Sequence, residues 1–442
     1  MESTNSCRLN TSVWISRVIQ LNTNVGYLNE FDFILIGNSD GILSNLPRSL
    51  KQVGFRTLAI GTPGMYLMMD KYVDQKIEIK VSDQYEFIKE FLDREEYVKN
   101  IEGTFLWCDD EIMRKVVSSD QISISDKLRI LPIKNEMYLS ILGSKVNQNL
   151  MFETLSLKTP MAEVFLSKID FIQKRPNLNK PLLVKSSHGG GGERLKFIPA
   201  GQELNVNLLP NEWFPILIQE FIKGKTASVD AFYKYGELKA WMYSIYTDVI
   251  YQWGPSLTRS YELPDNKDFL YSLESIGKAT KIDGMANVTF ILEEETGIHS
   301  IIEFDSRPSA WHHSFLDFNI PMKKILQESL QFNPKLYFNK AKVVYEPSRL
   351  FNHFLKHRNF TQAFLVILGF RLGKFGKPVS SYFYEIGILR TKFRFLIIWI
   401  RRSVIKALVE PGVAFKQKLP YSIRKNIDKQ VWLKFILTKI LS

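Results

Sequence analysis

The sequence holds four consecutive glycines close to a lysine, in the stretch VKSSHGGGGERLKF (184–197). Because glycine has no side chain, its backbone N–H groups approach phosphate oxygens closely, and a nearby lysine neutralises phosphate charge. We predict that one strand ends at Lys185, that the glycines form a phosphate-binding loop, and that a second strand follows. The absence of GxxxxGK[ST] excludes a Walker loop, and a flexible hairpin tip is the alternative. The glycines are Gly189, Gly190, Gly191 and Gly192.

A second stretch, IIEFDSRPS (301–309), carries alternating charges. Alternate residues of a strand project from one face, so Glu303, Asp305 and Arg307 are expected side by side. Two close carboxylates suit Mg²⁺ that bridges phosphates, and arginine suits phosphate or acyl-phosphate oxygens. An exposed strand face with an ion pair is the alternative.

In this order the two stretches resemble the ATP-grasp superfamily, which includes D-alanine:D-alanine ligase and biotin carboxylase. The resemblance covers roughly residues 30–330 and implies a small α/β domain followed by two α+β subdomains that hold ATP between them. It also implies that Lys145, in GSK before a helix, is the first nucleotide lysine and Lys185 the second. The four glycines would be the mobile flap over the phosphates.

The segment ILIQEFIKG (216–224) is similar to the family's hinge strand. The resemblance implies that Gln219, Glu220 and the backbone around Ile222 meet the adenine edge. Adenine needs one hydrogen-bond donor and one acceptor, and a strand backbone provides both. The alternative for the two polar side chains is a solvated strand edge.

The acidic stretch resembles the family's terminal E-x-N-x-R signature. Glu303 would be the bridging metal ligand, Asp305 stands in place of the usual asparagine and is still able to bind Mg²⁺, and Arg307 keeps its place.

Two positions depart from the family pattern. Thr226 stands where an acidic residue usually holds the ribose, and Thr289, in ANVTF, stands where another metal ligand is usual. Asn287 lies two residues away on the same face of the strand and is the alternative ligand.

Further candidates lie near these motifs. Arg259, in GPSLTRSY between two core strands, is a candidate for stabilising an acyl phosphate, or is a surface-loop arginine. Trp311, His312 and His313 follow the acidic stretch and are candidates for an acceptor pocket, or are ordinary loop residues. Their spacing does not indicate a metal site.

The N-terminal region alternates strand-like and helix-like runs, as in FDFILIG (31–37), 42–54 and RTLAIG (56–61). This order predicts a Rossmann-like parallel α/β sheet, without a dinucleotide site because GxGxxG is absent. We expect LRILPI (128–133) to be its last strand and residues 134–160 to form a helix.

Between 181 and 306 strand signals dominate and predict an α+β layer with mostly antiparallel strands. The predicted domains are a Rossmann-like domain, an ATP-grasp catalytic domain and a basic helical C-terminal module, at 1–133, 134–335 and 336–442. The predicted strands are 181–185, 195–200, 215–222, 227–233, 239–246, 285–292 and 299–305, with a helix at 272–283.

Bulk composition is that of a folded protein, since 45% of the 442 residues are hydrophobic. Cys7 and Cys108 are far apart and match neither a disulfide framework nor a zinc site. The N-terminus does not have the pattern of a secretory signal. We therefore expect a cytoplasmic protein.

The C-terminal segment is strongly basic, because residues 340–442 hold 21 of the 58 basic residues but 4 of the 46 acidic ones. Residues 393–409 form an amphipathic pattern with basic and apolar halves, too short in apolar length to span a bilayer. We expect this segment either to contact the anionic surface at the inner face of a membrane or to form a packed helical domain. No nucleic-acid-binding signature is visible.

These patterns predict a ligase that uses ATP and Mg²⁺ to activate a carboxylate, small or lipid-linked, for attack by an amine. One alternative is a small-molecule kinase of the same fold. Another is a catalytically weak ATP-binding peripheral membrane protein, which the residues Thr226 and Thr289 suggest.

Overall fold

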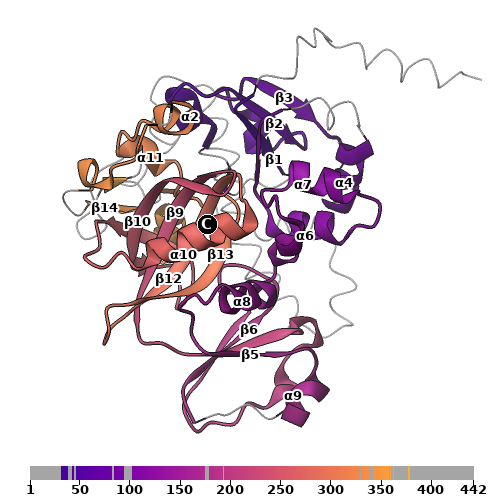
Figure 1. The fold of residues 1–442 in the computed structure, drawn as a ribbon, viewed down its shortest axis with the longest axis vertical. Coiled ribbons are helices and arrows are strands. Elements are labelled where there is room, and N and C mark those ends of the chain that lie inside the picture. The colour runs from indigo at the N-terminus through magenta and orange to yellow at the C-terminus, as the bar shows by residue number, and fades with distance from the viewer. Residues whose placement is uncertain are drawn as a thin grey trace, which may run out of the picture.

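A computed structural model gives the structure of the chain. The described residues form three β-sheets with helices packed around them. Figure 1 shows the sheet nearest the N-terminus at the top, the largest sheet in the middle and a small sheet at the bottom. The described residues are 31–37, 42–43, 46–81, 84–93, 102–174, 179–192, 194–328, 330–338, 342–345, 347–357, 359, 362 and 377–378.

The N-terminal sheet is parallel and has the strand order β3-β2-β1-β4. Its inner strands are continuous apolar runs because helices cover both faces of such a sheet. The strands are β1 (Phe33–Ile36), β2 (Thr57–Gly61), β3 (Gln75–Glu78) and β4 (Thr104–Trp107). The helices are α2 (Leu46–Gln52), α3 (Tyr66–Met69), α4 (Gln84–Asp93), α6 (Asp110–Ser118) and α7 (Ile124–Ile130).

The strand predicted at 128–133 is wrong, because residues 128–130 belong to helix α7 and 131–133 form no strand. The hydroxyl of Ser123 caps the helix by accepting a hydrogen bond from the backbone N–H of Asp126 at 3.1 Å. Pro132 follows shortly after the last helical residue, where proline commonly ends a helix. Local capping therefore outweighs the short apolar run.

The single helix predicted over 134–160 is also wrong, because a 3-10 helix, η1 (Glu136–Ile141), precedes a separate α-helix, α8 (Lys145–Thr154). Between them Gly143 has a φ of +68°, and a Cβ there would lie 2.8 Å from the carbonyl oxygen of Asp110. Only glycine fits such a position without strain. Ser144 then caps α8, so the break places Lys145 in its first turn.

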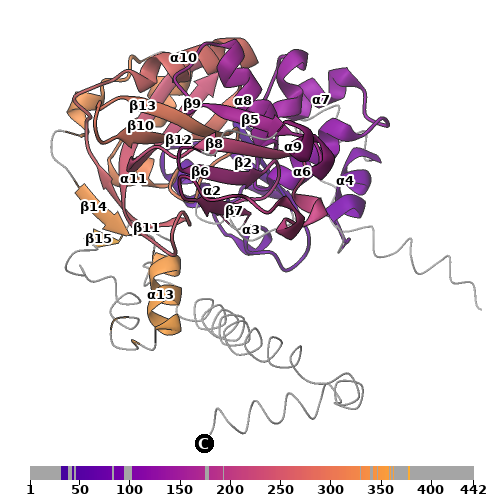
Figure 2. The same cartoon turned by 90° about the horizontal axis from the view of Figure 1, so that it is seen from below.

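The small sheet is antiparallel, with the order β5-β8-β6-β7. Figure 2 shows it from below together with its helix α9. Its apolar core, around Phe165, Val184 and Ile216, is separate from the other cores. Its elements are β5 (Ala162–Phe165), α9 (Lys168–Lys174), β6 (Leu182–Ser186), β7 (Leu195–Ile198), η2 (Val206–Leu208), η3 (Asn211–Trp213) and β8 (Ile216–Glu220).

The central sheet has the order β13-β12-β9-β10-β11-β14-β15, and all its pairs except β14-β15 are antiparallel. Its strands are β9 (Gly224–Lys234), β10 (Glu237–Val249), β11 (Ser256–Tyr261), β12 (Gly284–Glu293), β13 (His299–Asp305), β14 (Lys342–Tyr345) and β15 (Lys377–Pro378). Its helices are α10 (Phe269–Thr280), α11 (Ser314–Asp317), α12 (Met322–Gln327), η4 (Pro334–Leu336) and α13 (Pro347–Lys356).

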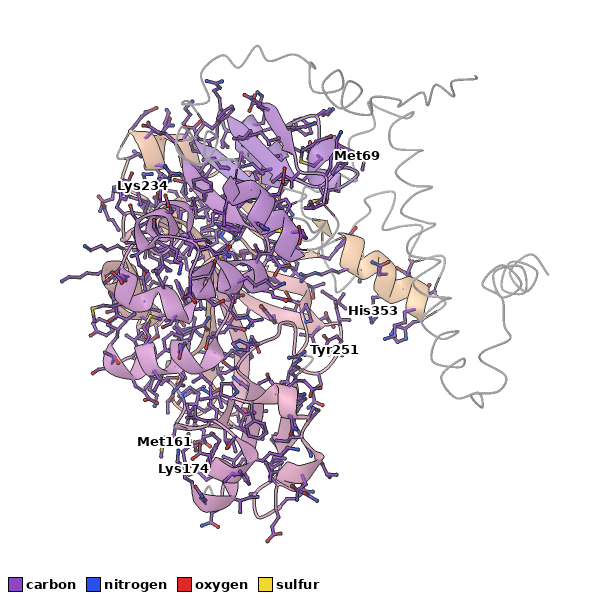
Figure 3. The ribbon with its side chains drawn as sticks, turned by 90° about the vertical axis from the view of Figure 1, so that its right-hand side faces the viewer. Met69, Met161, Lys174, Lys234, Tyr251 and His353 are labelled. Carbon is purple, nitrogen blue, oxygen red and sulfur yellow. The ribbon has the colours of Figure 1, made fainter. Side chains whose placement is uncertain are left out.

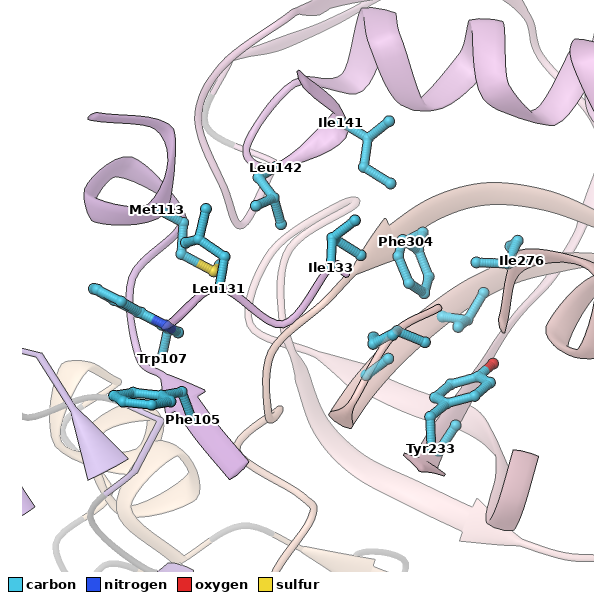
Figure 4. Close-up of a cluster of buried hydrophobic side chains, with 14 of the residues drawn as sticks. Phe105, Trp107, Met113, Leu131, Ile133, Ile141, Leu142, Tyr233, Ile276 and Phe304 are labelled. Atoms are coloured by element: carbon cyan, nitrogen blue, oxygen red, sulfur yellow. The ribbon is translucent and has the colours of Figure 1, made fainter. Parts of the chain in front are cut away.

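One hydrophobic core joins the N-terminal and central sheets. Figure 4 shows Phe105 and Trp107 of β4 in the same cluster as Tyr233 of β9 and Phe304 of β13, with Ile133 between the two groups. Burial of apolar surface stabilises a fold by roughly 25 cal/mol per Å². The two sheets therefore form one packed body.

No helix within the described ranges combines the length and apolar character needed to cross a membrane. The basic amphipathic pattern predicted at 393–409 lies outside the described residues.

The packing of α10 predicts an unusual effect of a glycine substitution. A Cβ at Gly277 would meet the carbonyl oxygen of Gly236 and lie 2.8 Å from the ring of Tyr233. In an open helix Gly→Ala stabilises by about 1 kcal/mol. Here overpacking costs about 1–3 kcal/mol, so Gly277→Ala should lower the free energy of unfolding in denaturant titration. Lys278→Ala, at an exposed neighbour on α10, should change it little; a more stable Gly277→Ala protein would contradict the packing.

Candidate active site

A cleft of about 490 Å³ is lined by residues of both the small and the central sheet. Pockets of this size hold small-molecule ligands. Every residue that the sequence singled out as a nucleotide, metal or catalytic candidate lines this one cleft. They are Lys145, Lys185, Gly189, Gly190, Gly191, Gly192, Gln219, Glu220, Ile222, Arg259, Glu303, Asp305 and Arg307.

Strand register sets the floor of the cleft. On β12 and β13, Asn287 pairs with Asp305 and Thr289 pairs with Glu303. On the other side of β12, Asn287 pairs with Asp230 of β9. Paired residues on neighbouring strands point to the same face, so these polar side chains form one continuous surface.

Lys145 joins the acidic strand to the glycine loop. Its Nζ lies 3.0 Å from Oε1 of Glu303 and donates to the carbonyl oxygen of Gly189 at 2.5 Å. Burial alone would lower the pKa of Lys145, but the charges of Glu303 and Asp305 outweigh it and raise this pKa. The ammonium group is therefore kept charged.

Lys185, at the end of β6, is more deeply buried. Its Nζ donates to Oε1 of Gln219 at 2.7 Å, so the oxygen of the Gln219 side chain is already occupied. Burial lowers the pKa of Lys185 to about 8, which the charge of Glu303 only partly offsets. Such a group is short of negative charge, as a lysine that receives a phosphate would be.

Arg307 connects the cleft to the N-terminal sheet. Its Nε donates to Oδ2 of Asp110, at the start of α6, at 2.7 Å, and its Nη2 lies 3.1 Å from Oδ2 of Asp305. Burial and the neighbouring charges of Glu303 and Asp110 nevertheless raise the pKa of Asp305 to about 7, against the opposing effect of Arg307. A cation bound beside Asp305 would lower this pKa and stabilise the ionised carboxylate.

The pKa of Glu303 behaves differently. Burial would raise it, but Lys145, Lys185 and Arg307 together hold it below its usual value. The two carboxyls of β13 therefore differ in how readily they ionise.

The glycine loop lies against the hairpin between β10 and β11. Tyr251, labelled in Figure 3, donates its hydroxyl hydrogen to the carbonyl oxygen of Gly191 at 2.5 Å. Gly192 has a φ of +78°, and a Cβ there would meet the carbonyl oxygen of Trp253 at 2.5 Å. The close approach of the two loops therefore requires glycine at 192.

The segment after β8 offers backbone groups to the cleft. The N–H groups of Glu220 and Phe221 are used by the carbonyls of Met161 and Pro181, whereas the N–H of Ile222 has no acceptor among the described residues. The Glu220 carboxylate pairs with Lys180 at 2.8 Å. The groups that this segment can offer to a ligand are therefore mainly its backbone N–H and C=O groups.

Arg259 lies inside strand β11, and its expected place between strands is wrong. It is buried because Asp230, fully buried on β9, accepts from its Nη1 at 3.1 Å. Its guanidinium also lies 4.8 Å from the ring centroids of Tyr246 and Trp311. Burial alone would lower the pKa of Arg259, but Tyr246 and Asp230 raise it. Arg259 is therefore a permanently charged side chain in the wall of the cleft.

Asp230 also orients Asn287. The Asn287 Nδ2 donates to Asp230 Oδ1 at 2.7 Å and to the hydroxyl of Ser228 at 2.8 Å. Both amide hydrogens are thereby used, so the carbonyl oxygen of Asn287 is the atom left for a ligand.

Of the three residues after the acidic strand, Trp311 lines the cleft and the two histidines do not. The backbone N–H of Ser309 donates to Nδ1 of His312 at 2.8 Å, which requires the neutral ring to carry its proton on Nε2. Burial lowers the pKa of His313 to about 4. The acceptor-pocket prediction is therefore wrong for His312 and His313, which are buried behind the wall.

Residues 142–310 match the family model for an ATP-grasp domain. They contain both lysines, the glycine loop and the acidic strand of the cleft. Residues 142–310 are an ATP-grasp domain. The predicted resemblance is thereby confirmed, while the domain boundaries at 133/134 and 335/336 stay predictions. No curated protein matches the sequence.

Solved structures share the ATP-grasp fold. The biotin carboxylase domain of 2-oxoglutarate carboxylase from Hydrogenobacter thermophilus, complexed with MgADP, ADP and bicarbonate, is 14% identical over 71% of this chain and 74% of its own, with a TM-score of 0.51. Biotin carboxylase from Campylobacter jejuni is 13% identical over 71% and 75%, with a TM-score of 0.50. An ADP complex of N5-carboxyaminoimidazole ribonucleotide synthetase is 13% identical over 65% and 73%, with a TM-score of 0.50. At these identities the likeness shows the fold.

The ATP-grasp cleft fits a magnesium ion by its donor chemistry. Glu303, Asp305 and the carbonyl oxygen of Asn287 are hard oxygen donors on one face of the strand pair. Within the described part of the chain, no group of three or more His, Cys, Asp and Glu side chains is arranged to hold a metal. Mg²⁺ bound with a nucleotide needs only one or two carboxylates, because phosphates and water complete its shell.

Two acidic residues that pair with arginines of the ATP-grasp cleft, Asp230 and Asp110, were missed by sequence reasoning. Asp230 had a signal, since it interrupts the apolar strand ASVDAFY (227–233). Asp110 had none, because it meets Arg307 across 197 positions of sequence.

The low pKa of Lys185 predicts how pH affects the stability of the nucleotide-free protein. Its pKa is about 8 in the folded chain against 10.5 for a free lysine, so the unfolded chain binds more protons between these values. The wild type should therefore gain stability relative to Lys185→Met as pH rises from 8 to 10, measured by denaturant titration. Lys223→Met, at an exposed lysine paired with Glu294, should show no such gain; a pH-independent difference for Lys185→Met would refute the assignment.

Proposed function

We propose that this protein is an ATP-dependent ligase that activates a carboxylate as an acyl phosphate for attack by an amine. The observation that carries the proposal is the meeting of Lys145, the buried Lys185, the glycine loop and the acidic strand in one cleft. The ATP-grasp match supports the nucleotide, as does the likeness to structures that hold ADP or MgADP.

In the proposed reaction, an oxygen of the substrate carboxylate attacks the γ-phosphorus of ATP and ADP leaves. The amine then attacks the acyl carbon, and inorganic phosphate leaves. Lys145, Lys185 and Arg307 stabilise the charge of the transferring phosphoryl group, so catalysis is mainly electrostatic and positional. No covalent enzyme nucleophile is needed.

The remaining groups bind and orient. The glycine loop covers the phosphates with its backbone N–H groups, and Lys145 holds the loop through the carbonyl oxygen of Gly189. The N–H of Ile222 and the carbonyl of Glu220 offer the donor and the acceptor that adenine needs. Arg259 adds a fixed positive charge at the wall.

Mg²⁺, when bound with the nucleotide, neutralises phosphate charge. Glu303, Asp305 and the carbonyl oxygen of Asn287 would hold it. Asn287 is favoured over Thr289 as the ligand. Its Nδ2 donates to Asp230 and Ser228, which leaves its carbonyl oxygen available for the metal ion.

Hydroxylamine tests the acyl phosphate directly. With Mg·ATP and a panel of carboxylic acids, the protein should release phosphate with at least one acid, and hydroxylamine should convert that acid to a hydroxamate. Glu303→Gln should lower the rate about 100-fold or more, as expected for loss of one preorganised charged group in a catalytic site.

The matched control is Glu294→Gln, at a carboxylate whose side chain is 59% exposed and paired with Lys223. Its rate should stay near that of the wild type. ADP formed without any hydroxamate would indicate phosphoryl transfer to a hydroxyl instead, and the absence of acid-dependent phosphate release across the panel would contradict the ligase.

A further inference from the structure

We infer that His188, the residue just before the four glycines, is the catalytic base that accepts a proton from the amine as it attacks the acyl phosphate. The inference rests on the proposed function and adds a residue to it. His188 lines the cleft. The amine has to lose one proton as it becomes an amide, and a neutral imidazole is well suited to accept it.

Contacts on both sides of His188 hold its backbone at the start of α8. The carbonyl oxygen of Ser187 accepts from the backbone N–H of Lys145 at 2.9 Å, and the carbonyl oxygen of Gly189 accepts from Nζ of Lys145 at 2.5 Å. The same Nζ lies 3.0 Å from Oε1 of Glu303. His188 is therefore held next to the lysine that contacts the acidic strand, where the phosphoryl group is transferred in the proposed reaction.

One ring nitrogen of His188 is used and the other is free. Nδ1 lies 2.8 Å from the carbonyl oxygen of Gly143. Because a carbonyl oxygen can only accept, Nδ1 carries the proton, and the lone pair of the neutral ring is on Nε2. Nε2 has no hydrogen-bond partner in the part of the chain that the structure describes, and it is not a buried atom. It is thus a proton acceptor that a ligand can reach.

The carboxylates of the cleft are already paired. Each one that lines the cleft, among the described residues, lies within 3.1 Å of a lysine or arginine nitrogen; the pairs are Glu220 with Lys180, Glu303 with Lys145, and Asp305 with Arg307. Glu303 and Asp305 are also the proposed metal ligands. The lone pair of His188 is therefore the proton acceptor that neither phosphate nor metal binding uses.

The surroundings of His188 keep its ring neutral. Burial lowers the pKa of His188, and so do the charges of Arg114 on α6, Lys145 on α8 and Arg194 just before β7, while the hydrogen bond to Gly143 opposes them only in part. Bound phosphate would neutralise some of this positive charge. It would thereby raise the pKa of His188 toward neutral pH, where a general base is most effective.

In the inferred step, the amine nitrogen forms a bond to the acyl carbon. The bond from this carbon to the phosphate oxygen breaks, and its electron pair leaves with inorganic phosphate. One N–H proton of the amine moves to Nε2 of His188, and the charged ring then releases this proton to water. The products are the amide, phosphate and a neutral histidine ready for the next cycle.

The experiment uses the full chain, Mg·ATP and the acid that gives a hydroxamate. Hydroxylamine is unprotonated at neutral pH and attacks acyl phosphates without a base, so the hydroxamate reports formation of the acyl phosphate. Amide formation is measured in parallel with ammonia, glycine, ethanolamine and putrescine as amines. The ratio of amide to hydroxamate then reports the base alone.

His188→Asn keeps a donor for Gly143, because the asparagine amide takes the position of Nδ1, but it has no group in place of Nε2. Amide formation should fall about 100-fold or more, as is usual for loss of a general base, while hydroxamate formation stays near the wild-type rate. A histidine that only anchors the glycine loop predicts unchanged amide formation in His188→Asn; that result, or an equal loss of both products, would refute the base.

The matched control is His357→Asn, at an exposed histidine directly after α13. It should form both products at the wild-type rates, and a loss of amide in this variant like that in His188→Asn would also count against the inference.

A second measurement needs no substrate. In full-length protein labelled with ¹⁵N-histidine, the resonances of His188 are assigned by their absence from His188→Asn. At neutral pH they should be those of a neutral ring protonated at Nδ1. A charged ring, or a proton on Nε2, would contradict the assignment of Nε2 as the base.

Failure of the inference and failure of the proposed function give different results. Hydroxamate formed by the wild type, without amide from any of the four amines, would overturn the role of His188 and leave the acyl phosphate in place. Absence of hydroxamate in the wild type would overturn the proposed function, and this inference with it.

Discussion

Compensation of buried charge is the constraint on which the cleft depends. Removing an ion from water costs several kcal/mol unless an opposite charge lies beside it. Glu303 stays readily ionised in spite of burial because Lys145, Lys185 and Arg307 surround it. Arg307 is balanced in turn by Asp110 of helix α6, in the N-terminal region. The N-terminal region is therefore part of the electrostatics of the ATP-grasp cleft as well as of its packing.

The sequence predicts those residues of the site that belong to a short continuous motif. A run of glycines next to Lys185, and charges alternating at Glu303 and Asp305, specify local geometry, because strand periodicity fixes which side chains share a face. The ion pair of Arg307 with Asp110 depends on how the N-terminal region packs on the central sheet. No local pattern of the sequence encodes this contact.

The same limit explains the errors in secondary structure. Strands β5 and β14 are absent from the predicted strands; they have four residues each and are only partly buried, so they carry little periodic signal. The sequence predicts Arg259 between strands, yet its ion pair with Asp230 makes its burial in β11 tolerable. At Gly143 the helix breaks because the chain passes close to Asp110, a tertiary reason that also sets the position of Lys145.

Because the small sheet has its own core, Lys145 and Lys185 belong to two differently packed parts of the molecule. Lys145 belongs to α8, which is tied to the acidic strand by the bond from the Phe304 N–H to Gln148 Oε1. Lys185 belongs to β6, whose apolar packing is confined to the small sheet. The two parts meet at the start of α8, because the backbone N–H of Lys145 donates to the carbonyl oxygen of Ser187 at 2.9 Å and its Nζ donates to that of Gly189. Lys145 is thus held from both sides, so any shift of the small sheet relative to the acidic strand would break one of its contacts.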